Sequence, residues 1–263
     1  MSTRFGATRG KVLAVAALAA IIASTLSGPA SAASDGNGGD HGGRSDHWGV
    51  IARNTIGSPV AAPRNGPFGS FGVTGPSASP PYGQGSLGIE VADNSTSLSP
   101  PSEKADFGNE VDFYGDPVQG LRNIGFHVFQ TQENVGYGGA ANMPTIRFEI
   151  DPNLTALPDD NYSTMVWVPE AAPVTNRWSG YIDATSTGSW YLTGNEVPTC
   201  TRAVQCSLQE LKTALDDGGT GATILSAGVS KGRDHMWIGA VDGLRINRTV
   251  YDFEADGVRT RRA

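Results

Sequence analysis

The chain has 263 residues, and its 26 acidic side chains outnumber the 19 basic ones, which gives a formal net charge of −7. This excess of negative charge argues against nucleic acid or an anionic membrane as the partner, because both need a basic protein surface. The chain contains 35 Gly and 16 Pro, and only 17% of its residues are charged. Such a composition is typical of a loop-rich β fold rather than a helical one.

The first 32 residues have the pattern of a secretory signal peptide. Arg4, Arg9 and Lys11 precede an apolar run over residues 12–23, and residues 30–32 (Ala-Ser-Ala) fit the small-x-small cleavage pattern. The apolar run is short for a bilayer span, and no second run of membrane length follows. We therefore expect a secreted, soluble chain without a membrane span after cleavage. Its remaining 16 basic and 26 acidic residues give a formal charge of −10.

Two segments near the ends of this mature chain lack hydrophobic periodicity. Residues 33–47 are rich in Gly and Asp, which predicts a flexible leader. Residues 259–263 are basic and are expected to form a frayed tail. The stretch between them, residues 48–258, can bury one sizeable core, and all-β folds of this size are often single domains. We predict a single β-sandwich domain there.

Short segments in which apolar and polar residues alternate recur along the chain, as expected for strands with one buried face. In residues 86–91, for example, Leu87, Ile89 and Val91 share one face. The spacing of the segments predicts an all-β fold, namely a two-sheet antiparallel jelly-roll sandwich. The predicted strands cover residues 48–52, 68–73, 86–91, 105–111, 121–131, 144–150, 163–168, 178–183, 189–193 and 223–229, followed by a hairpin over 236–254.

One short helix is predicted over about residues 207–217. Ser207 and Glu210 form a capping box, and three leucines follow at helical spacing. Cys200 and Cys206, the two cysteines of the chain, come just before it. In an oxidising compartment they would most simply form a disulfide that closes a small loop. A free or metal-binding pair is the alternative.

The closing hairpin contains a carboxylate at an unexpected position. In a regular strand Asp242 points to the same side as Leu244 and Ile246, which is the core side. Burying an unpaired carboxylate is costly, so either Asp242 is hydrogen-bonded or a bulge at Gly243 re-aims it. We predict that Asp242 bonds to backbone groups of an adjacent loop and has a structural role.

Short motifs along the chain carry a family resemblance, and they lie at residues 85–91, 178–183, 188–191, 227–232 and 239–246. Together they resemble secreted bacterial jelly-roll domains that are related in architecture to carbohydrate-binding modules and to laminin-G or concanavalin-like sandwiches. The last motif is similar to the closing strand of such domains. The resemblance covers most of residues 68–254 and implies the fold more than a specific activity.

Aromatic side chains provide the main functional clue. Trp178 and Tyr181 share one predicted strand, and Trp190 and Tyr191 lie in the next. Aromatic rings stack on the apolar C–H faces of sugars, which makes these four residues candidates for ligand binding. Alternation places Trp190 and Tyr191 on opposite sheet faces, so at most one of them belongs to a given surface. The alternative place for the tryptophans is the core.

A catalytic alternative rests on Glu149 and Asp151. Jelly-roll glucanases of the laminarinase type carry Glu-x-Asp-x-x-Glu on one strand, where the three carboxylates serve as nucleophile, helper and general acid. Here Leu154 occupies the third position and Pro152 interrupts the strand. The other interpretation is an outward-facing Glu149 and a strand-ending Asp151. No Gly-x-Ser-x-Gly elbow and no paired His spacing indicates a different active site.

A structural calcium ion is one option for such a sandwich, with Asp242, Asp252 and Glu254 as oxygen ligands. The chain has no Asp-x-Asp-x-Asp-Gly loop, and carboxylates that cap loops are the alternative for all three. No other cofactor is expected.

The leading hypothesis is an exported, non-enzymatic, monomeric β-sandwich that binds an extracellular polysaccharide or cell-surface glycan, or makes another surface interaction. An atypical or degenerate polysaccharide hydrolase on the same fold is the first alternative. A structural extracellular protein without a small ligand is the second. A glycan-binding assay separates the leading hypothesis from the structural protein without a ligand. Release of reducing sugar would identify the polysaccharide hydrolase.

Overall fold

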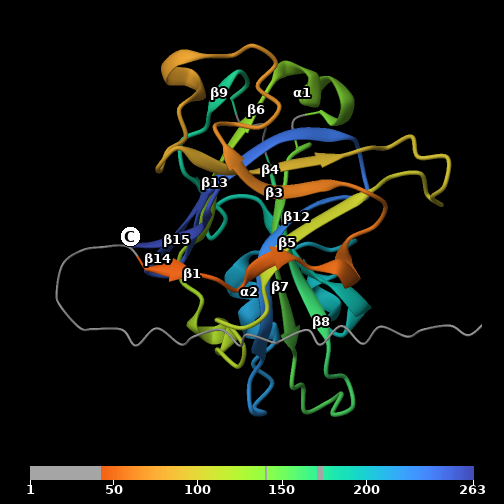
Figure 1. Ribbon diagram of the computed structural model, residues 1–263. Helices are drawn as coiled ribbons and strands as arrows, with labels where there is room; N and C mark the ends of the chain where they lie inside the picture. Colours follow the sequence, from red (N-terminus) through yellow and green to blue (C-terminus); the bar gives the residue numbers. More distant parts are fainter. Residues whose placement is uncertain (1–42, 140, 171–173) are drawn as a thin grey trace, which may run out of the picture. The chain divides into compact units, whose positions relative to one another are not determined.

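The computed structural model describes residues 43–139, 141–170 and 174–263 (Figure 1). They form two antiparallel sheets with hydrophobic side chains between them, so the predicted all-β, two-sheet sandwich is confirmed. All of them lie in one structural unit, Asp40–Ala263. The predicted signal peptide and most of the predicted leader lie outside the described residues.

The nine-stranded sheet is organised around the closing hairpin. Its order is β1–β15–β14–β13–β4–β3, and β13 also pairs with β6, which in turn pairs with β9 and β10. The register along β13 shifts between Asp242 and Arg245, where Gly243 has a φ of 60°. The strands are β1 (Arg44–Ser45), β3 (Val60–Asn65), β4 (Gly85–Val91), β6 (Ile124–Gln130), β9 (Arg177–Trp178), β10 (Ile182–Asp183), β13 (Trp237–Ile246), β14 (Thr249–Glu254) and β15 (Gly257–Arg262).

The six-stranded sheet has the order β11–β8–β7–β12–β5–β2. Alternation along β7 sends Ile146, Phe148 and Ile150 into the core and puts Arg147 and Glu149 on the opposite side. We call this opposite side, which is turned away from the core, the outer face. The strands are β2 (Trp48–Val50), β5 (Lys104–Asn109), β7 (Thr145–Asp151), β8 (Ser163–Val168), β11 (Ser189–Leu192) and β12 (Thr223–Gly232).

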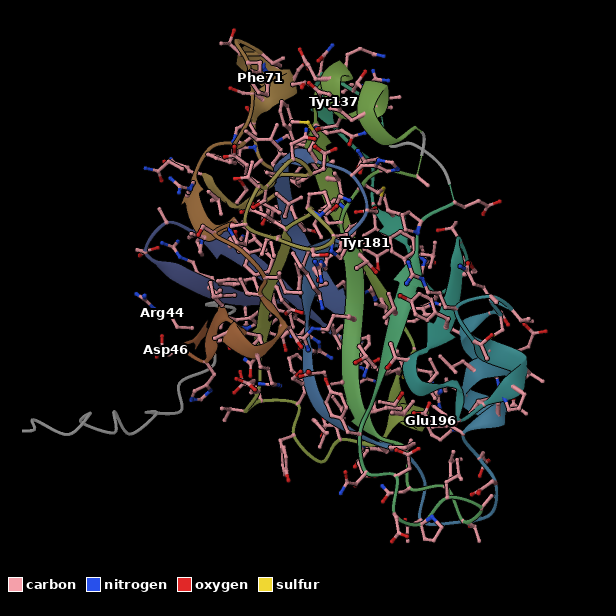
Figure 2. All side chains as sticks on the ribbon, turned by 90° about the vertical axis from the view of Figure 1, so that its right-hand side faces the viewer. Arg44, Asp46, Phe71, Tyr137, Tyr181 and Glu196 are labelled. Atoms are coloured by element: carbon pink, nitrogen blue, oxygen red, sulfur yellow. A yellow bond between two sulfur atoms is a disulfide. The ribbon has the colours of Figure 1, made fainter. Side chains whose placement is uncertain are left out.

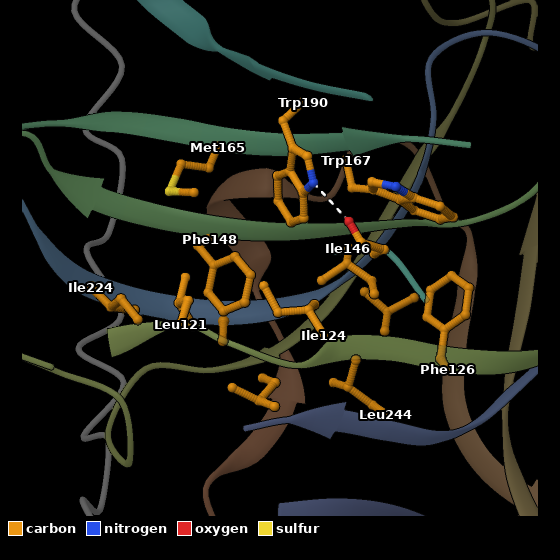
Figure 3. Packing of buried hydrophobic residues seen from close by; sticks show 14 of the residues in the cluster. Leu121, Ile124, Phe126, Ile146, Phe148, Met165, Trp167, Trp190, Ile224 and Leu244 are labelled. Carbon is orange, nitrogen blue, oxygen red and sulfur yellow. Dashed lines mark hydrogen bonds between the residues drawn. The ribbon is translucent and has the colours of Figure 1, made fainter. Parts of the chain in front are cut away.

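Aromatic rings fill much of the core between the sheets (Figure 3). Trp167 meets Phe126 edge to face with ring centroids 5.7 Å apart, and Trp190 stacks on Phe148 at 6.2 Å. The buried indole N–H of Trp190 donates to the carbonyl of Ala184 at 2.9 Å. A buried indole needs such an acceptor, so this bond fixes the orientation of the ring.

The predicted helix is α2 (Leu208–Ala214), and its capping box is present. The Ser207 hydroxyl accepts from the backbone N–H of Glu210, while the Glu210 carboxylate accepts from that of Ser207. A second helix, α1 (Gln132–Gly138), was not predicted; its Asn134 side chain exchanges hydrogen bonds with both backbone groups of Ile238. Short 3₁₀ turns complete the described secondary structure: η1 (Ala52–Asn54), η2 (Gly75–Ala78), η3 (Val118–Gly120), η4 (Thr193–Asn195) and η5 (Pro198–Cys200).

The two ends of the described chain form strands where a leader and a frayed tail were predicted. Ser45 in β1 pairs with Val258, and β15 pairs along its whole length with β14. Arg261 of β15 is held by an ion pair with the buried Asp252. The predicted boundaries at residues 47 and 259 are therefore wrong. The sequences of β1 and β15 are polar and were not recognised as strands, although charged side chains are common in strands at the end of a sheet.

A second difference concerns the segment before β4. β3 forms between the predicted strands 48–52 and 68–73, where no strand was predicted. It lies at the end of the sheet order, where its Pro63 is tolerated. Residues 68–73, predicted as a strand, form turns instead, because Gly69, Phe71 and Gly72 have positive φ. Figure 2 shows Phe71 at the outer tip of this segment.

Candidate functional site

The structure separates the four aromatic residues that were predicted to bind a ligand. Trp190 is only 1% exposed and belongs to the core, so its prediction as a ligand platform is wrong. Tyr191, the next residue along β11, faces the outer side of the six-stranded sheet and is partly exposed. Trp178 and Tyr181 belong to the nine-stranded side, next to β6. The four residues therefore do not form one surface.

Around Trp178 and Tyr181 the aromatic rings pack mainly against other side chains of the protein. Trp178 packs against Phe129, with centroids 5.7 Å apart, and its indole N–H donates to a backbone carbonyl in η2 at 3.3 Å. Tyr181 and Tyr82 each lie 5.9 Å from the His127 ring. Tyr181 is 40% exposed, so its ring is accessible from this side. Figure 2 shows its position.

A cavity lies over the outer face of the six-stranded sheet, and Tyr191 forms part of its wall. It has two adjoining parts of about 260 and 410 Å³, which share Thr145, Val166, Tyr191 and Ser230 among other residues. These volumes are near the range of ~300–1,000 Å³ that is common for small-ligand sites. We call it the outer-face cavity. Its charged lining residues are Lys104, Asp106, Arg147, Arg202, Lys231, Arg233 and Asp234.

The disulfide loop places two polar side chains at this cavity. Cys200 and Cys206 are joined by a disulfide, as predicted, and Arg202 and Gln205 within the loop line the cavity. The loop is tied to β11 by paired backbone hydrogen bonds between Trp190 and Cys206, at 2.7 and 2.9 Å. The bridge thus holds Arg202 beside the strand that carries the Tyr191 ring.

A buried ion pair lies at the base of the cavity. Arg147 reaches from β7 across β12 to Asp106 on β5, and its Nε lies 3.1 and 3.0 Å from the two carboxylate oxygens. Two paired glycines make room for the guanidinium: a Cβ at Gly108 or Gly228 would lie 2.7 or 3.1 Å from Nη2 of Arg147. Arg147 and Asp106 are 2% and 0% exposed, so this pair is part of the interior of the outer face.

Glu149 lies on the other side of Arg147, and both of its carboxylate oxygens accept hydrogen bonds. Tyr162 Oη and Asn54 Nδ2 donate to one carboxylate oxygen at 2.5 and 2.8 Å, and Ser226 and Arg53 donate to the other. Burial by itself raises the pKa of Glu149, but the hydrogen bonds from Ser226, Tyr162 and Asn54 outweigh that effect and hold the pKa at about 2. Glu149 is therefore an ionised structural centre.

This environment does not support the catalytic interpretation of Glu149 and Asp151. Glu149 is 0% exposed and both of its oxygens have donors, so a sugar cannot reach it and it holds no proton to donate. Asp151 ends β7 and accepts from the backbone N–H of Asn153 at 3.1 Å, which is a turn contact. The expectation of an outward Glu149 was right about its side of the sheet, but the side chain is covered by η1 and by Tyr162.

The three carboxylates considered for calcium have protein donors. Asp242 accepts from the backbone N–H groups of Tyr82, in the loop before β4, and of Phe253, at 3.1 and 3.2 Å. This is the structural contact that was predicted for Asp242. Asp252 pairs with Arg261, and Glu254 accepts from the Gln84 N–H at 2.9 Å. Within the described part of the chain, no group of three or more His, Cys, Asp or Glu side chains is arranged to hold a metal ion.

Opening the disulfide loop is expected to lower the free energy of unfolding by about 2 kcal/mol, because the unfolded chain regains loop entropy. Alanine at both Cys200 and Cys206 is the suitable change, since these side chains are buried and serine would bury hydroxyl groups. Urea unfolding measures the effect, and reduction of the wild-type protein should reproduce it while leaving the double variant unchanged. A double variant as stable as the wild type would show that the bridge does not stabilise the loop.

Sequence reasoning missed most of the side chains that meet at this site. Arg53, Asn54 and Tyr162 surround Glu149 from distant segments, and Lys104 and Arg233 reach the cavity from strand ends. No helix among the described residues is both long and apolar enough to cross a bilayer.

No family model, curated protein or solved structure matches the chain, so the interpretation of the cavity rests on its geometry and chemistry.

Proposed function

We propose that the chain is a non-enzymatic glycan-binding module whose ligand occupies the outer-face cavity. The observation that carries the proposal is Tyr191, a partly exposed aromatic ring in the wall of the cavity, surrounded by hydrogen-bonding side chains. An aromatic ring can stack on the apolar face of a sugar, while nearby hydroxyl and charged groups bond to sugar hydroxyls. The lining includes the hydroxyls of Thr145, Thr164, Thr193 and Ser230, of which those of Thr145 and Ser230 already donate to backbone carbonyls.

An extracellular place of action fits this proposal. The signal-peptide pattern at the start of the sequence suits export, and the Cys200–Cys206 disulfide suits an oxidising compartment. The partner we propose is a polysaccharide or a glycan at a cell surface. A hydrolase is the less favoured alternative, because Glu149 is inaccessible and ionised.

Binding to polysaccharides in affinity electrophoresis tests the proposal. Tyr191→Ala is expected to weaken binding about tenfold, since the loss of one stacking partner is worth roughly 1.4 kcal/mol. Tyr191→Phe keeps the ring and should bind like the wild type. Tyr181→Ala is the matched control, because Tyr181 is 40% exposed but lies on the nine-stranded side.

Two outcomes would contradict the proposal. One is that no polysaccharide in a broad glycan screen retards the protein, which would favour a structural protein without a small ligand. The other is that Tyr181→Ala abolishes binding while Tyr191→Ala leaves it unchanged. Release of reducing sugar that is lost in Glu149→Gln would instead support the hydrolase.

A further inference from the structure

We propose that the outer-face cavity selects an anionic glycan, that is, a polysaccharide whose sugar rings carry carboxylate or sulfate groups. This inference rests on the proposed function, because it names the ligand class of the same site. Its basis is a convergence of cations at one cavity in a protein whose formal net charge is −7.

The lining contains five cationic and two acidic side chains, and the acids account for only two of the cations. Arg147 is paired with Asp106, and Lys231 with Asp234. The three remaining cations are Lys104, Arg202 and Arg233. Among the residues that the structure describes, none of these three lies within salt-bridge distance of an acidic side chain. The cavity lining thus carries three cations that have no ion-pair partner among the described residues.

Each of these cations is positioned by a different segment of the fold. Arg233, in the turn after β12, donates to the backbone carbonyls of Ser102 and Pro100 at 3.1 and 2.8 Å. Those acceptors are neutral, so they orient the guanidinium without cancelling its charge. Arg202 is held in the disulfide loop, and Lys104 begins β5 at the edge of the Arg147–Asp106 pair. A guanidinium that is held in advance, as in Arg233, loses little side-chain entropy when an anion binds.

Lys104 is a partly buried cation without a direct ion-pair contact among the described residues. Burial lowers the pKa of Lys104, and the charges of Asp106 and Glu149, opposed by that of Arg147, only partly offset this effect. An anion bound beside Lys104 would supply this direct contact. A carboxylate or sulfate group also matches the planar donor fork of the two arginines.

The aromatic ring and the cations lie close enough to act on one ligand. Tyr191, Arg202 and Arg233 all line both parts of the cavity. A sugar stacked on Tyr191 would therefore bring an acidic substituent to Arg202. The ordinary explanation for surface cations is a solvated surface, but that explanation does not account for two arginines and a lysine meeting around an aromatic cavity wall.

Affinity electrophoresis and calorimetry with polygalacturonate test the inference, with its fully methyl-esterified form as the neutral counterpart of the same backbone. Polygalacturonate should bind at least tenfold more tightly than the ester, and the difference should shrink as salt is added. The Arg202→Gln/Arg233→Gln variant should lose at least tenfold in affinity for polygalacturonate. The control Arg177→Gln, an exposed cation on β9, should bind like the wild type. Dextran sulfate in a parallel arm shows whether sulfate or carboxylate is preferred.

The outcomes separate this inference from the proposed function. Suppose that neutral glycans bind as tightly as acidic ones, that Tyr191→Ala weakens this binding, and that the double arginine variant does not. The glycan site would then stand, and the anionic selectivity would be wrong. If polyglutamate, which has carboxylates but no sugar rings, binds as tightly as polygalacturonate, the ligand is not a glycan and both fail. Because the protein is itself acidic, unspecific attraction to polyanions is not expected.

Discussion

Replacing Arg147 with Met is expected to lower the free energy of unfolding by about 3–5 kcal/mol, the usual cost of removing one partner of a buried ion pair. Arg147 lies between Asp106 and Glu149, and both of these carboxylates are 0% exposed. Methionine keeps much of the aliphatic volume of the side chain, so the loss reports mainly the missing charge. The Asp106 carboxylate would lose its counter-charge and its donors, because Arg147 donates all the side-chain hydrogen bonds described for it.

Urea unfolding measures this effect, and two variants control for it. Arg177→Met changes an exposed arginine and should stay within about 0.5 kcal/mol of the wild type. Adding Asp106→Asn to Arg147→Met should restore part of the lost stability, because it removes the uncompensated charge. A loss below about 1 kcal/mol for Arg147→Met alone would contradict the role given to the network.

Raising the pH from 5 to 8 is expected to destabilise the protein through Asp242. Burial raises the pKa of Asp242 to about 8, and the charge of Asp252 adds to the rise, although bonds from backbone N–H groups oppose it. The ordinary pKa of the group is 3.8. Between these values the folded protein binds a proton that the unfolded chain has released, so this contribution to stability is complete below pH 3.8 and is lost as the pH rises to 8. At about 1.4 kcal/mol per pKa unit, the loss is a few kcal/mol.

Unfolding curves for the wild type and two variants at several pH values between 5 and 8 provide the measurement. Asp242→Asn cannot ionise and should flatten the slope. Asp242→Ala leaves the backbone N–H groups of Tyr82 and Phe253 without their acceptor and should cost about 1–3 kcal/mol at pH 5. Equal slopes in the wild type and Asp242→Asn would show that Asp242 does not titrate in this range. Repeating the series with Ca²⁺ tests for a cation at this carboxylate, because a bound cation keeps it ionised.

The elements that could be predicted from the sequence are those whose signal is local. β4, β7 and the closing hairpin show alternation within a few residues, and the capping box of Ser207 and Glu210 lies within four. The disulfide follows from two nearby cysteines in a chain with a signal-peptide pattern. By contrast, β1, β3 and β15 become strands only because a partner strand is present, and their polar or Pro-containing sequences give no periodicity.

The candidate site was harder to predict because its residues come together only in the folded chain. Alternation correctly placed Trp190 and Tyr191 on opposite faces, but it could not say which face was the core. Glu149 was assigned to the outer side, yet its burial depends on Arg53 and Tyr162, which lie far away in the sequence. The charge of the cavity was equally hidden, since an acidic overall composition gives no sign of a local group of cations.

The most direct test of the account is to map where a bound glycan lies. In an amide chemical-shift titration with polygalacturonate fragments, the largest shifts are expected at Tyr191, Arg202 and Arg233 and in their immediate neighbours. Residues around Tyr181 and Trp178, on the nine-stranded side, should remain unchanged. Shifts concentrated at Tyr181 and Trp178, or no shifts at any ligand concentration, would contradict the assignment of the glycan site to the outer face of the six-stranded sheet.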